Sequence, residues 1–212
     1  MNIVLRNIIL CTVKKHFPTC KTGRKSTSAD IILDELLHML WSGCPWRALR
    51  CKGTSFQTVH RHFTNWSQSG VFKEAYAIAY KLQKRPSRRN LRFHCIDSSF
   101  VKNIYGRDCI GRNPTDRGRF ATKLSALVDQ DGLPVALTFF PANRNDVRTV
   151  EDTLLNSIHS ERGALYADKG YDSKQIRTFV EQHGYIERIS RRKHHVHRLV
   201  NRRRNIVERF FS

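Results

Sequence analysis

The hydrophobic pattern of this chain changes within one basic string, KRPSRRN, at residues 84–90. Before the string, apolar residues recur at three- and four-residue steps, which is the period of an amphipathic helix. After it, short apolar runs bounded by turn residues alternate with helical patterns. The string itself is charged and contains Pro86, which favours a linker. We therefore predict two domains of different architecture, with a boundary near residues 85–91.

The first part of the chain is predicted to be helical. Helices are expected at residues 29–41, 55–66 and about 71–84, after a basic N-terminal segment over residues 1–27. The second helix directs four polar side chains outward from its apolar face: Gln57, His60, Arg61 and Asn65. Two helices and a turn favour a helix-turn-helix-like DNA-binding domain at residues 28–85, with these four residues as DNA contacts. Two packed helices with a solvated polar face are the alternative.

The second part of the chain is predicted to be an α/β domain. Strand-like runs lie at residues 92–97, 122–130, 133–140, 164–167 and 185–189, and helical patterns at 145–158, 172–184 and 200–211. The order is three strands followed by helix, strand, helix, strand and helix. Asp131-Gly132, between the second and third runs, is a hairpin signal. This order predicts a mixed sheet with helices packed on it.

The balance of charge indicates a polyanionic partner. Lys and Arg number 38 against 18 Asp and Glu, which gives a formal net charge of +20 spread over the whole chain. Because no basic amphipathic anchor stands out, DNA or RNA is favoured over a membrane surface. A basic protein of the ribosomal type is the alternative.

Cysteine usage and the N-terminal residues indicate an intracellular protein. The six cysteines form no CxxC pair and no regular framework, which is typical of reduced thiols. The apolar start, MNIVLRNIILC, is interrupted by Arg6 and is far shorter than the ~20 residues of a spanning helix. No signal peptide is expected, because a small-residue cleavage site is missing. A bacterial protein of this kind would lie in the cytoplasm or on the nucleoid.

Three acidic residues lie where the element order would let them meet. Asp97 ends the first predicted strand, Asp168 ends the fourth, and Glu208 lies on the last helix. Carboxylates bind hard divalent cations, and two such ions about 3.5–4 Å apart can stabilise both oxygens of a phosphodiester undergoing cleavage. Gly170 would allow a sharp turn after Asp168. Spacing alone does not single out these three among the 18 acidic residues.

Other charged residues have simpler explanations. Asp129 and Asp131 flank the hairpin turn. Asp146 and Asp172 each precede a helix that they could cap, with Asn145 as the alternative cap to Asp146. Three histidines crowd the string RRKHHVHR at residues 191–198, but no cysteine pair accompanies them. A basic DNA-contacting loop is therefore favoured there over a zinc site.

Four stretches of the second part carry a resemblance to a known family: CIDSSFVKN, GRNPTDRGRFATKLSALVDQDGLPVALTFFPANRND, LYADKGYDS and RRRNIVERFF. Over residues 28–212 the sequence resembles the DDE transposases of bacterial insertion sequences, in the fourth-and-fifth insertion-sequence superfamily. The stretches LWSGCPWRAL and SFQTVHRHFTNWSQSGVF resemble that family's helical DNA-binding segment. The resemblance implies an RNase H-like DDE catalytic domain at residues 86–212.

The resemblance also implies an activity and a site. Asp97, Asp168 and Glu208 fall on the family's catalytic carboxylates, which hold two Mg²⁺ ions that Mn²⁺ can replace. The implied reaction is hydrolysis of DNA to free a 3′-hydroxyl, followed by joining of that hydroxyl to target DNA. The implied partners are double-stranded DNA, as terminal inverted repeats and as target, and further copies of the chain on paired ends, in a homodimer or larger assembly.

Three arginines are candidate DNA contacts in this part of the chain. Arg204 stands one helical turn before Glu208, in the Arg-x-x-x-Glu signature of the family, and could contact phosphate or support the carboxylate. A solvated helix face is the alternative. Arg117 and Arg119 lie in the loop NPTDRGR, which could approach a phosphate backbone or be a solvated loop.

The chain departs from the family signature at two positions. Asn201 stands where a tyrosine is expected, and the expected lysine would fall seven residues after Glu208, beyond Ser212. We therefore expect the last helix to be truncated. A catalytically inactive or domesticated DNA-binding remnant is the alternative function, and an RNase H-like nuclease acting on RNA or hybrid duplexes is a third.

Overall fold

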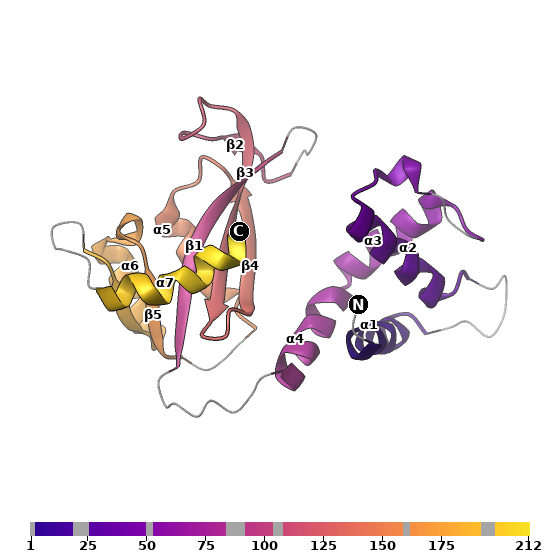
Figure 1. Cartoon of the computed structure of the whole chain (residues 1–212), viewed down its shortest axis with the longest axis horizontal. Coiled ribbons are helices and arrows are strands. Elements are labelled where there is room, and N and C mark those ends of the chain that lie inside the picture. The colour runs from indigo at the N-terminus through magenta and orange to yellow at the C-terminus, as the bar shows by residue number, and fades with distance from the viewer. Residues whose placement is uncertain are drawn as a thin grey trace. The chain divides into compact units, whose positions relative to one another are not determined.

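The structure is a computed structural model of the 212-residue chain. It describes residues 3–18, 26–49, 53–83, 92–103, 108–158, 162–191 and 198–212, and of residues 198–202 the backbone alone. The chain forms two compact units, Met1–Arg85 and Pro86–Ser212, of which the second runs from magenta to yellow in Figure 1. The division falls within the basic string where the hydrophobic pattern changes.

The first unit is helical in its described residues. It contains α1 (Ile3–His16), α2 (Ala29–Ser42), α3 (Phe56–Gln68) and α4 (Val71–Gln83), with one 3₁₀ turn, η1 (Trp46–Ala48). The three helices predicted before the boundary are confirmed as α2, α3 and α4, with ends within a few residues of those expected. That this unit binds DNA stays a prediction.

Local sequence sets where these helices begin and end. The Ser28 hydroxyl accepts a hydrogen bond from the Asp30 N–H, at 3.3 Å, and caps α2. The Ser55 hydroxyl caps α3 in the same way, accepting from the Thr58 N–H at 3.3 Å. Gly43 then ends α2 in the left-handed conformation, at φ 66°, where a side chain would be strained.

The prediction of a separate basic segment over residues 1–27 is wrong for residues 3–16, because they form α1 and belong to the helical unit. Leu10 and Val13 of this helix are buried in the core with Trp66. Apolar residues occupy most of the circumference of α1, so no single face marks it as a helix in the sequence.

Charged pairs join α1 to its neighbours. Arg6 pairs with Asp34 and, at 3.1 Å, with Asp30 on α2. Glu74 on α4 accepts a hydrogen bond from Lys15 Nζ at 2.6 Å and lies 2.7 Å from His16 Nε2. The hydrogen bonds from His16 and then Lys15 hold the pKa of the Glu74 carboxyl below its usual range.

The second unit is built on a mixed sheet, six-stranded in the described residues. Its strands are β1 (Phe93–Lys102), β2 (Gly111–Arg112), β3 (Phe120–Asp129), β4 (Pro134–Pro141), β5 (Ala164–Ala167) and β6 (Ile186–Ile189). β1 pairs antiparallel with β3 and parallel with β5; β4 continues the sheet beyond β3, and β6 continues it beyond β5. The five predicted strands are present, and the two-residue β2 is an addition.

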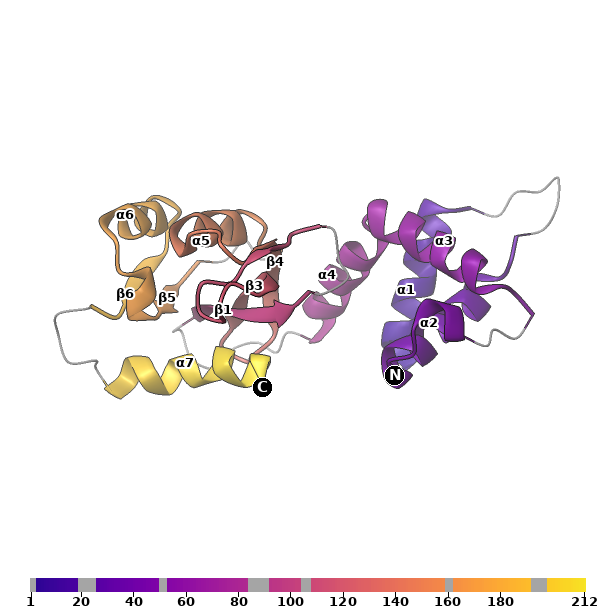
Figure 2. The same cartoon turned by 90° about the horizontal axis from the view of Figure 1, so that it is seen from above.

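Helices cover both faces of this sheet. Figure 2 shows α5 (Asp146–Leu155) and α6 (Lys174–Gln182) on one face and α7 (Arg198–Phe211) on the other. The predicted α/β class, with an RNase H-like mixed sheet preceded by a helical region, is confirmed. None of the helices in the described residues is long and apolar enough to cross a membrane.

Glu74→Gln is expected to lower the thermal stability of the helical unit in a pH-dependent way. The depressed pKa means that the folded state favours the ionised carboxylate, so its stabilisation is present above the usual value of 4.5 and is lost as the pH falls through the folded pKa. Melts of the full chain, followed by circular dichroism, should separate wild type from variant at about pH 7 and converge at about pH 3.

The matched control is Glu181→Gln, which removes an exposed carboxylate from α6 in the other unit. It should leave the melting curve unchanged. A loss of stability in Glu74→Gln that persists undiminished at low pH would contradict the ionic origin of the effect.

Candidate active site

Three carboxylates come together on the α7 face of the sheet. In the parallel pair of β1 and β5, Cys95 lies beside Tyr166; two residues further along the chain stand Asp97, still on β1, and Asp168, in extended backbone directly after β5. Strand side chains alternate between faces, so both aspartates share the face on which Cys95 and Tyr166 pack against α7. Glu208 comes from α7 itself.

Asp97 does not end its strand, contrary to the prediction. β1 continues to Lys102 because β3 accompanies it by antiparallel pairing as far as Ala121. The element that ends beside Asp97 is its parallel neighbour, β5, which stops at Ala167. The aspartate is therefore exposed on one side only, and 24% of its side chain is accessible to solvent.

Arg204 lies among the three carboxylates. Its Nη1 atom is 3.2 Å from Asp168 Oδ1, and its Nη2 atom is 3.4 Å from Glu208 Oε1 and 4.0 Å from Asp97 Oδ2. The Arg204 side chain is only 13% exposed, whereas Asp168 is 38% and Glu208 53% exposed. One guanidinium thus bridges acids from two strands and from its own helix. This position excludes the alternative of a solvated helix face.

The acid that is least exposed has a perturbed pKa. Burial raises the pKa of Asp97 above its ordinary value of 3.8 and is the largest cause. The Ser98 N–H, which donates to Asp97 Oδ1 at 2.8 Å, and the charge of Arg204 oppose this rise, while Asp168 and Glu208 add to it. Ionisation of Asp97 therefore carries a cost in free energy in the folded chain.

A tyrosine joins the turn after Asp168 to the strand that carries Asp97. Tyr171, in the 3₁₀ turn η2 (Lys169–Tyr171) after Asp168, donates its hydroxyl to Ser98 Oγ at 3.2 Å. Its ring is buried, and burial raises the pKa of the hydroxyl well above its usual range. Gly170 lies outside the left-handed region, so the turn does not require a glycine for its backbone, contrary to the prediction. Sequence reasoning missed this support by Tyr171.

The donor chemistry of the site fits a hard divalent cation, because three carboxylates converge on one cationic group. Asp97, Asp168 and Glu208 are the residues that would hold it. In the described parts of the chain, however, no three His, Cys, Asp or Glu side chains are arranged to hold a metal ion, and a cationic side chain, Arg204, lies among the three carboxylates.

The four candidate DNA contacts of the helical unit are all exposed along α3: Gln57, His60, Arg61 and Asn65. His60 also packs edge-on against Trp46, with ring centroids 4.8 Å apart, so it supports η1 as well as facing solvent. Arg117 and Arg119 belong to the other unit. The structure therefore gives each unit its own set of exposed candidate contacts.

The turn that carries Arg117 and Arg119 is closed by hydrogen bonds. The Asn113 side-chain oxygen accepts from the Thr115 N–H at 3.0 Å and from its hydroxyl at 2.8 Å. Arg117 has a positive φ of 48°, and the Arg119 N–H donates to the Asp116 carbonyl at 2.9 Å. Both arginine side chains are exposed. The turn is thus an ordered platform for them, beyond what the loop sequence indicated.

Three of the acidic residues predicted to serve in turns or as helix caps have structural partners. Asp129 accepts hydrogen bonds from two N–H groups of the hairpin turn, as predicted. Asn145, and not Asp146, caps α5, and Asp146 pairs at 2.7 Å with the buried Lys123. Ser173 caps α6, and Asp172 pairs with Arg177 instead, at 2.8 Å.

Of the histidine string at residues 191–198, only the two end residues belong to the described part of the chain. Residues 192–197 lie outside the described residues, so the zinc and DNA-loop alternatives for the string stay untested.

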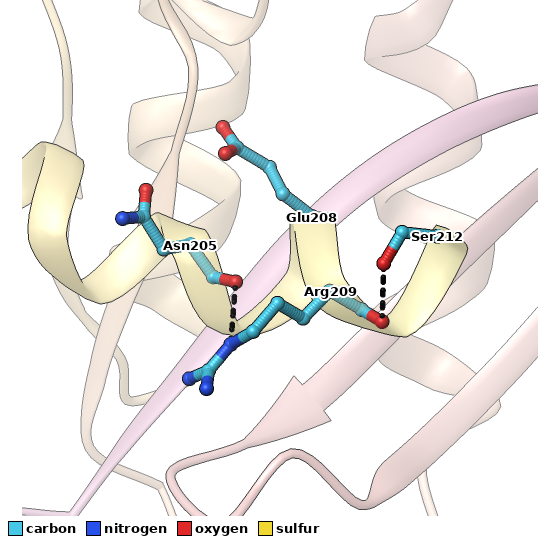
Figure 3. A pocket seen from close by; sticks show the side chains of 4 residues that line it. All are labelled: Asn205, Glu208, Arg209 and Ser212. Carbon is cyan, nitrogen blue, oxygen red and sulfur yellow. Dashed lines mark hydrogen bonds between the residues drawn. The ribbon is translucent and has the colours of Figure 1, made fainter.

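An open pocket of about 610 Å³ lies along the outer side of α7 and is lined by Asn205, Glu208, Arg209 and Ser212. Figure 3 shows the Glu208 side chain projecting to a different side of the helix from Arg209, which donates its Nε–H to the Asn205 carbonyl at 3.2 Å. The pocket contains one of the three carboxylates. The site is therefore defined by the contacts of Arg204 and not by this hollow.

Comparisons with known proteins cover both units. Residues 89–212 match a family model described as "Transposase DDE domain", and residues 10–76 match one described as "Putative transposase of IS4/5 family". A "Putative transposase for insertion sequence element IS402" from Burkholderia cepacia is 34% identical over 99 residues, which are 42% of this chain and 46% of that protein. The chain thus spans less than half the length of this curated relative.

Two solved structures are distantly similar. One is a simian T-cell lymphotropic virus intasome in complex with PP2A regulatory subunit B56 gamma, at 14% identity and a TM-score of 0.37, covering 84% of this chain and 58% of the other. The second is the Mos1 transposase paired-end complex with left transposon end, at 12% identity and a TM-score of 0.32, covering 79% and 61%.

Asp97→Asn is expected to raise the melting temperature of the metal-free chain by a few degrees at about pH 7. The raised pKa of Asp97 means that its stability contribution is complete at low pH and is lost as the pH rises through the folded pKa. An amide of the same size accepts from the Ser98 N–H without carrying the charge. Melts in a chelator should show the difference at about pH 7 and its disappearance at about pH 3.

Asp131→Asn is the control, because Asp131 is an exposed carboxylate of the hairpin turn. Its melting temperature should match that of wild type. A fall in the melting temperature of Asp97→Asn at about pH 7 would show that the ion pair with Arg204 outweighs the burial of the carboxylate.

Proposed function

This chain belongs to the DDE transposase family, of the IS4/5 type, and we propose that it binds the terminal inverted repeats of its own insertion element and catalyses metal-dependent cleavage and strand transfer of DNA. The observation that carries the catalytic part is the convergence of Asp97, Asp168 and Glu208 around one cation, Arg204. The proposed cation is Mg²⁺, bound as two ions.

The proposed roles follow from the positions of the side chains. Divalent ions at the three carboxylates would stabilise charge on the attacking and leaving oxygens of the phosphodiester. Asp97 lies on β1 and Asp168 directly follows β5, and the Tyr171–Ser98 hydrogen bond joins the turn after Asp168 to β1. Glu208 comes from α7, which packs on the sheet through the buried Val207. Three carboxylates held in position by the fold suit a site that must orient the reacting groups.

DNA is the partner that the surface chemistry supports. The net charge of +20 provides sequence-independent attraction to phosphate, and α3 offers amide and basic side chains of the kind that read base edges. The turn carrying Arg117 and Arg119 offers two further phosphate contacts on the catalytic unit. We propose that α3 selects the element end and that this turn positions the backbone near the carboxylates, within a homodimer or larger assembly on paired ends.

Asp97→Ala and Asp168→Ala are each expected to reduce Mg²⁺-dependent cleavage of an element-end duplex by at least about 100-fold, the upper range for losing a supporting residue of a metal site. Removing one carboxylate deprives the metal ions of a ligand, and no neighbouring side chain can take its place. Glu181→Ala, an exposed acid on α6, is the matched control and should cut at the wild-type rate.

The outcomes separate the proposal from its alternative. Intact cleavage in Asp97→Ala would show that the carboxylate assignment is wrong. Binding of the element end by a wild-type chain that neither cuts nor joins it would show that the chain is a DNA-binding remnant.

Arg117→Gln and Arg119→Gln are expected to weaken DNA binding to a similar degree on every sequence. Each variant should reduce the slope of log affinity against log salt by about 0.9, the value for one lost phosphate contact. Fluorescence anisotropy of a labelled duplex over a series of salt concentrations measures both quantities. Lys174→Gln on α6, on the opposite face of the sheet from Arg204, is the control and should keep the wild-type slope. An unchanged slope in both arginine variants would exclude the turn from the DNA interface.

A further inference from the structure

We propose that Arg204 is an internal counter-ion of the carboxylate site, and that a divalent metal and Arg204 compete for the carboxylates, so that a DNA phosphate that takes up Arg204 favours metal binding. The proposal rests on the proposed function, because it assumes that DNA and metal meet at these carboxylates. It adds a linkage between the two ligands, so that each would increase the affinity of the chain for the other.

The contacts of Arg204 carry the argument. Both terminal nitrogens of its guanidinium are engaged, with Asp168 at 3.2 Å and with Glu208 and Asp97 at 3.4 and 4.0 Å. Asp97 lies on β1 and Asp168 directly follows β5, so the Arg204 side chain alone links acids from these two positions and from α7. Without it, three carboxylates would face one another with no cation between them.

Arg204 and a metal cannot share these oxygens. A guanidinium has only donors and cannot be a metal ligand, and it stays protonated at any physiological pH. Mg²⁺ would need to sit about 2.0–2.1 Å from the same carboxylate oxygens. A divalent ion at that distance would face the positive charge of Arg204 across the site. The metal and Arg204 therefore compete for one position.

The environment of Arg204 favours its release to another anion. Its Nε atom is buried and has no hydrogen-bond partner within the described structure, which leaves a donor unsatisfied. None of its three contacts is a close bidentate pair, the geometry in which arginine binds carboxylate or phosphate most strongly. Glu208 and Asp168 are exposed enough for an incoming phosphate to approach from solvent.

The consequence is positive linkage. A DNA phosphate that takes up Arg204 frees three carboxylates for the metal, and a metal bound by the carboxylates frees Arg204 for DNA. Linkage of this kind is reciprocal and typically changes an affinity by about 5- to 150-fold. The chain on its own would thus bind metal weakly, and its cleavage site would form only on DNA.

The test is a calorimetric titration of the full-length protein with Mn²⁺ in the absence of DNA. Arg204→Gln removes the charge and keeps much of the side-chain length, so it should bind Mn²⁺ at least about fivefold more tightly than wild type. Arg209→Gln, one turn further along the same helix and exposed, contacts none of the carboxylates and should match wild type. The same variants should be melted in a chelator, where Arg204→Gln is expected to be less stable than Arg209→Gln and to be stabilised more by added Mn²⁺.

A second titration, with a short duplex present, tests the linkage. Wild type should gain Mn²⁺ affinity when the duplex is added, and Arg204→Gln should gain less. If Arg204→Gln does not fold, Arg204→Lys serves instead, because a compact ammonium cannot span three carboxylates and should compete less well.

Two results would overturn the proposal: Mn²⁺ affinity in the Arg204 variants equal to or below that of wild type, or a duplex effect of the same size in wild type and variant. These results are separate from failure of the proposed function. A chain that shows the Arg204 effect but cuts no DNA would contradict the function alone, whereas a chain that cuts DNA without the effect would contradict the counter-ion alone.

Discussion

Three carboxylates within reach of one another repel unless a cation lies between them, and the second unit meets this constraint with Arg204. The guanidinium fixes the angular position of α7 over the sheet because it contacts acids from β1 and β5 and from its own helix. Val207, fully buried against Cys95, fixes the depth of the same helix. Polar and apolar contacts of α7 thus act together to place Glu208 above the aspartates.

The sheet supplies the other half of the site through its register. Because β1 is parallel to β5 and antiparallel to β3, it keeps a partner on one side after β5 has ended. Asp97 lies at that step, where one side of the strand is open and the other is packed. This explains why its carboxyl is buried enough to have a raised pKa and accessible enough to serve as a ligand. In the proposed function, this position gives up stability for chemistry, a compromise that is common at catalytic sites.

The periodicity of the chain made most of the fold predictable, and two kinds of element escaped it. Strands and helices with one clear apolar face, such as α3 and β4, were located to within a few residues. Helix α1 escaped because apolar residues surround it, and β2 because two residues carry no period. The cap of α5 is Asn145, one of the two residues that the sequence offered, whereas the cap of α6 is Ser173 and not the predicted Asp172, since neighbouring polar residues compete for the same N–H groups.

The sequence by itself determined that the chain is basic and that it has two units of different architecture. It also determined, through a family resemblance, that Asp97, Asp168 and Glu208 are the acids to consider. Only the tertiary structure decided that these acids meet, because that depends on strand register and on how α7 packs. It also decided the place of Arg204. In the sequence this residue is one arginine among many on a basic helix, and local spacing links it to Glu208 alone. Its contacts with Asp97 and Asp168 join residues 107 and 36 positions apart in the chain. Local sequence patterns cannot predict contacts at such separations, because these contacts depend on how the sheet and α7 pack.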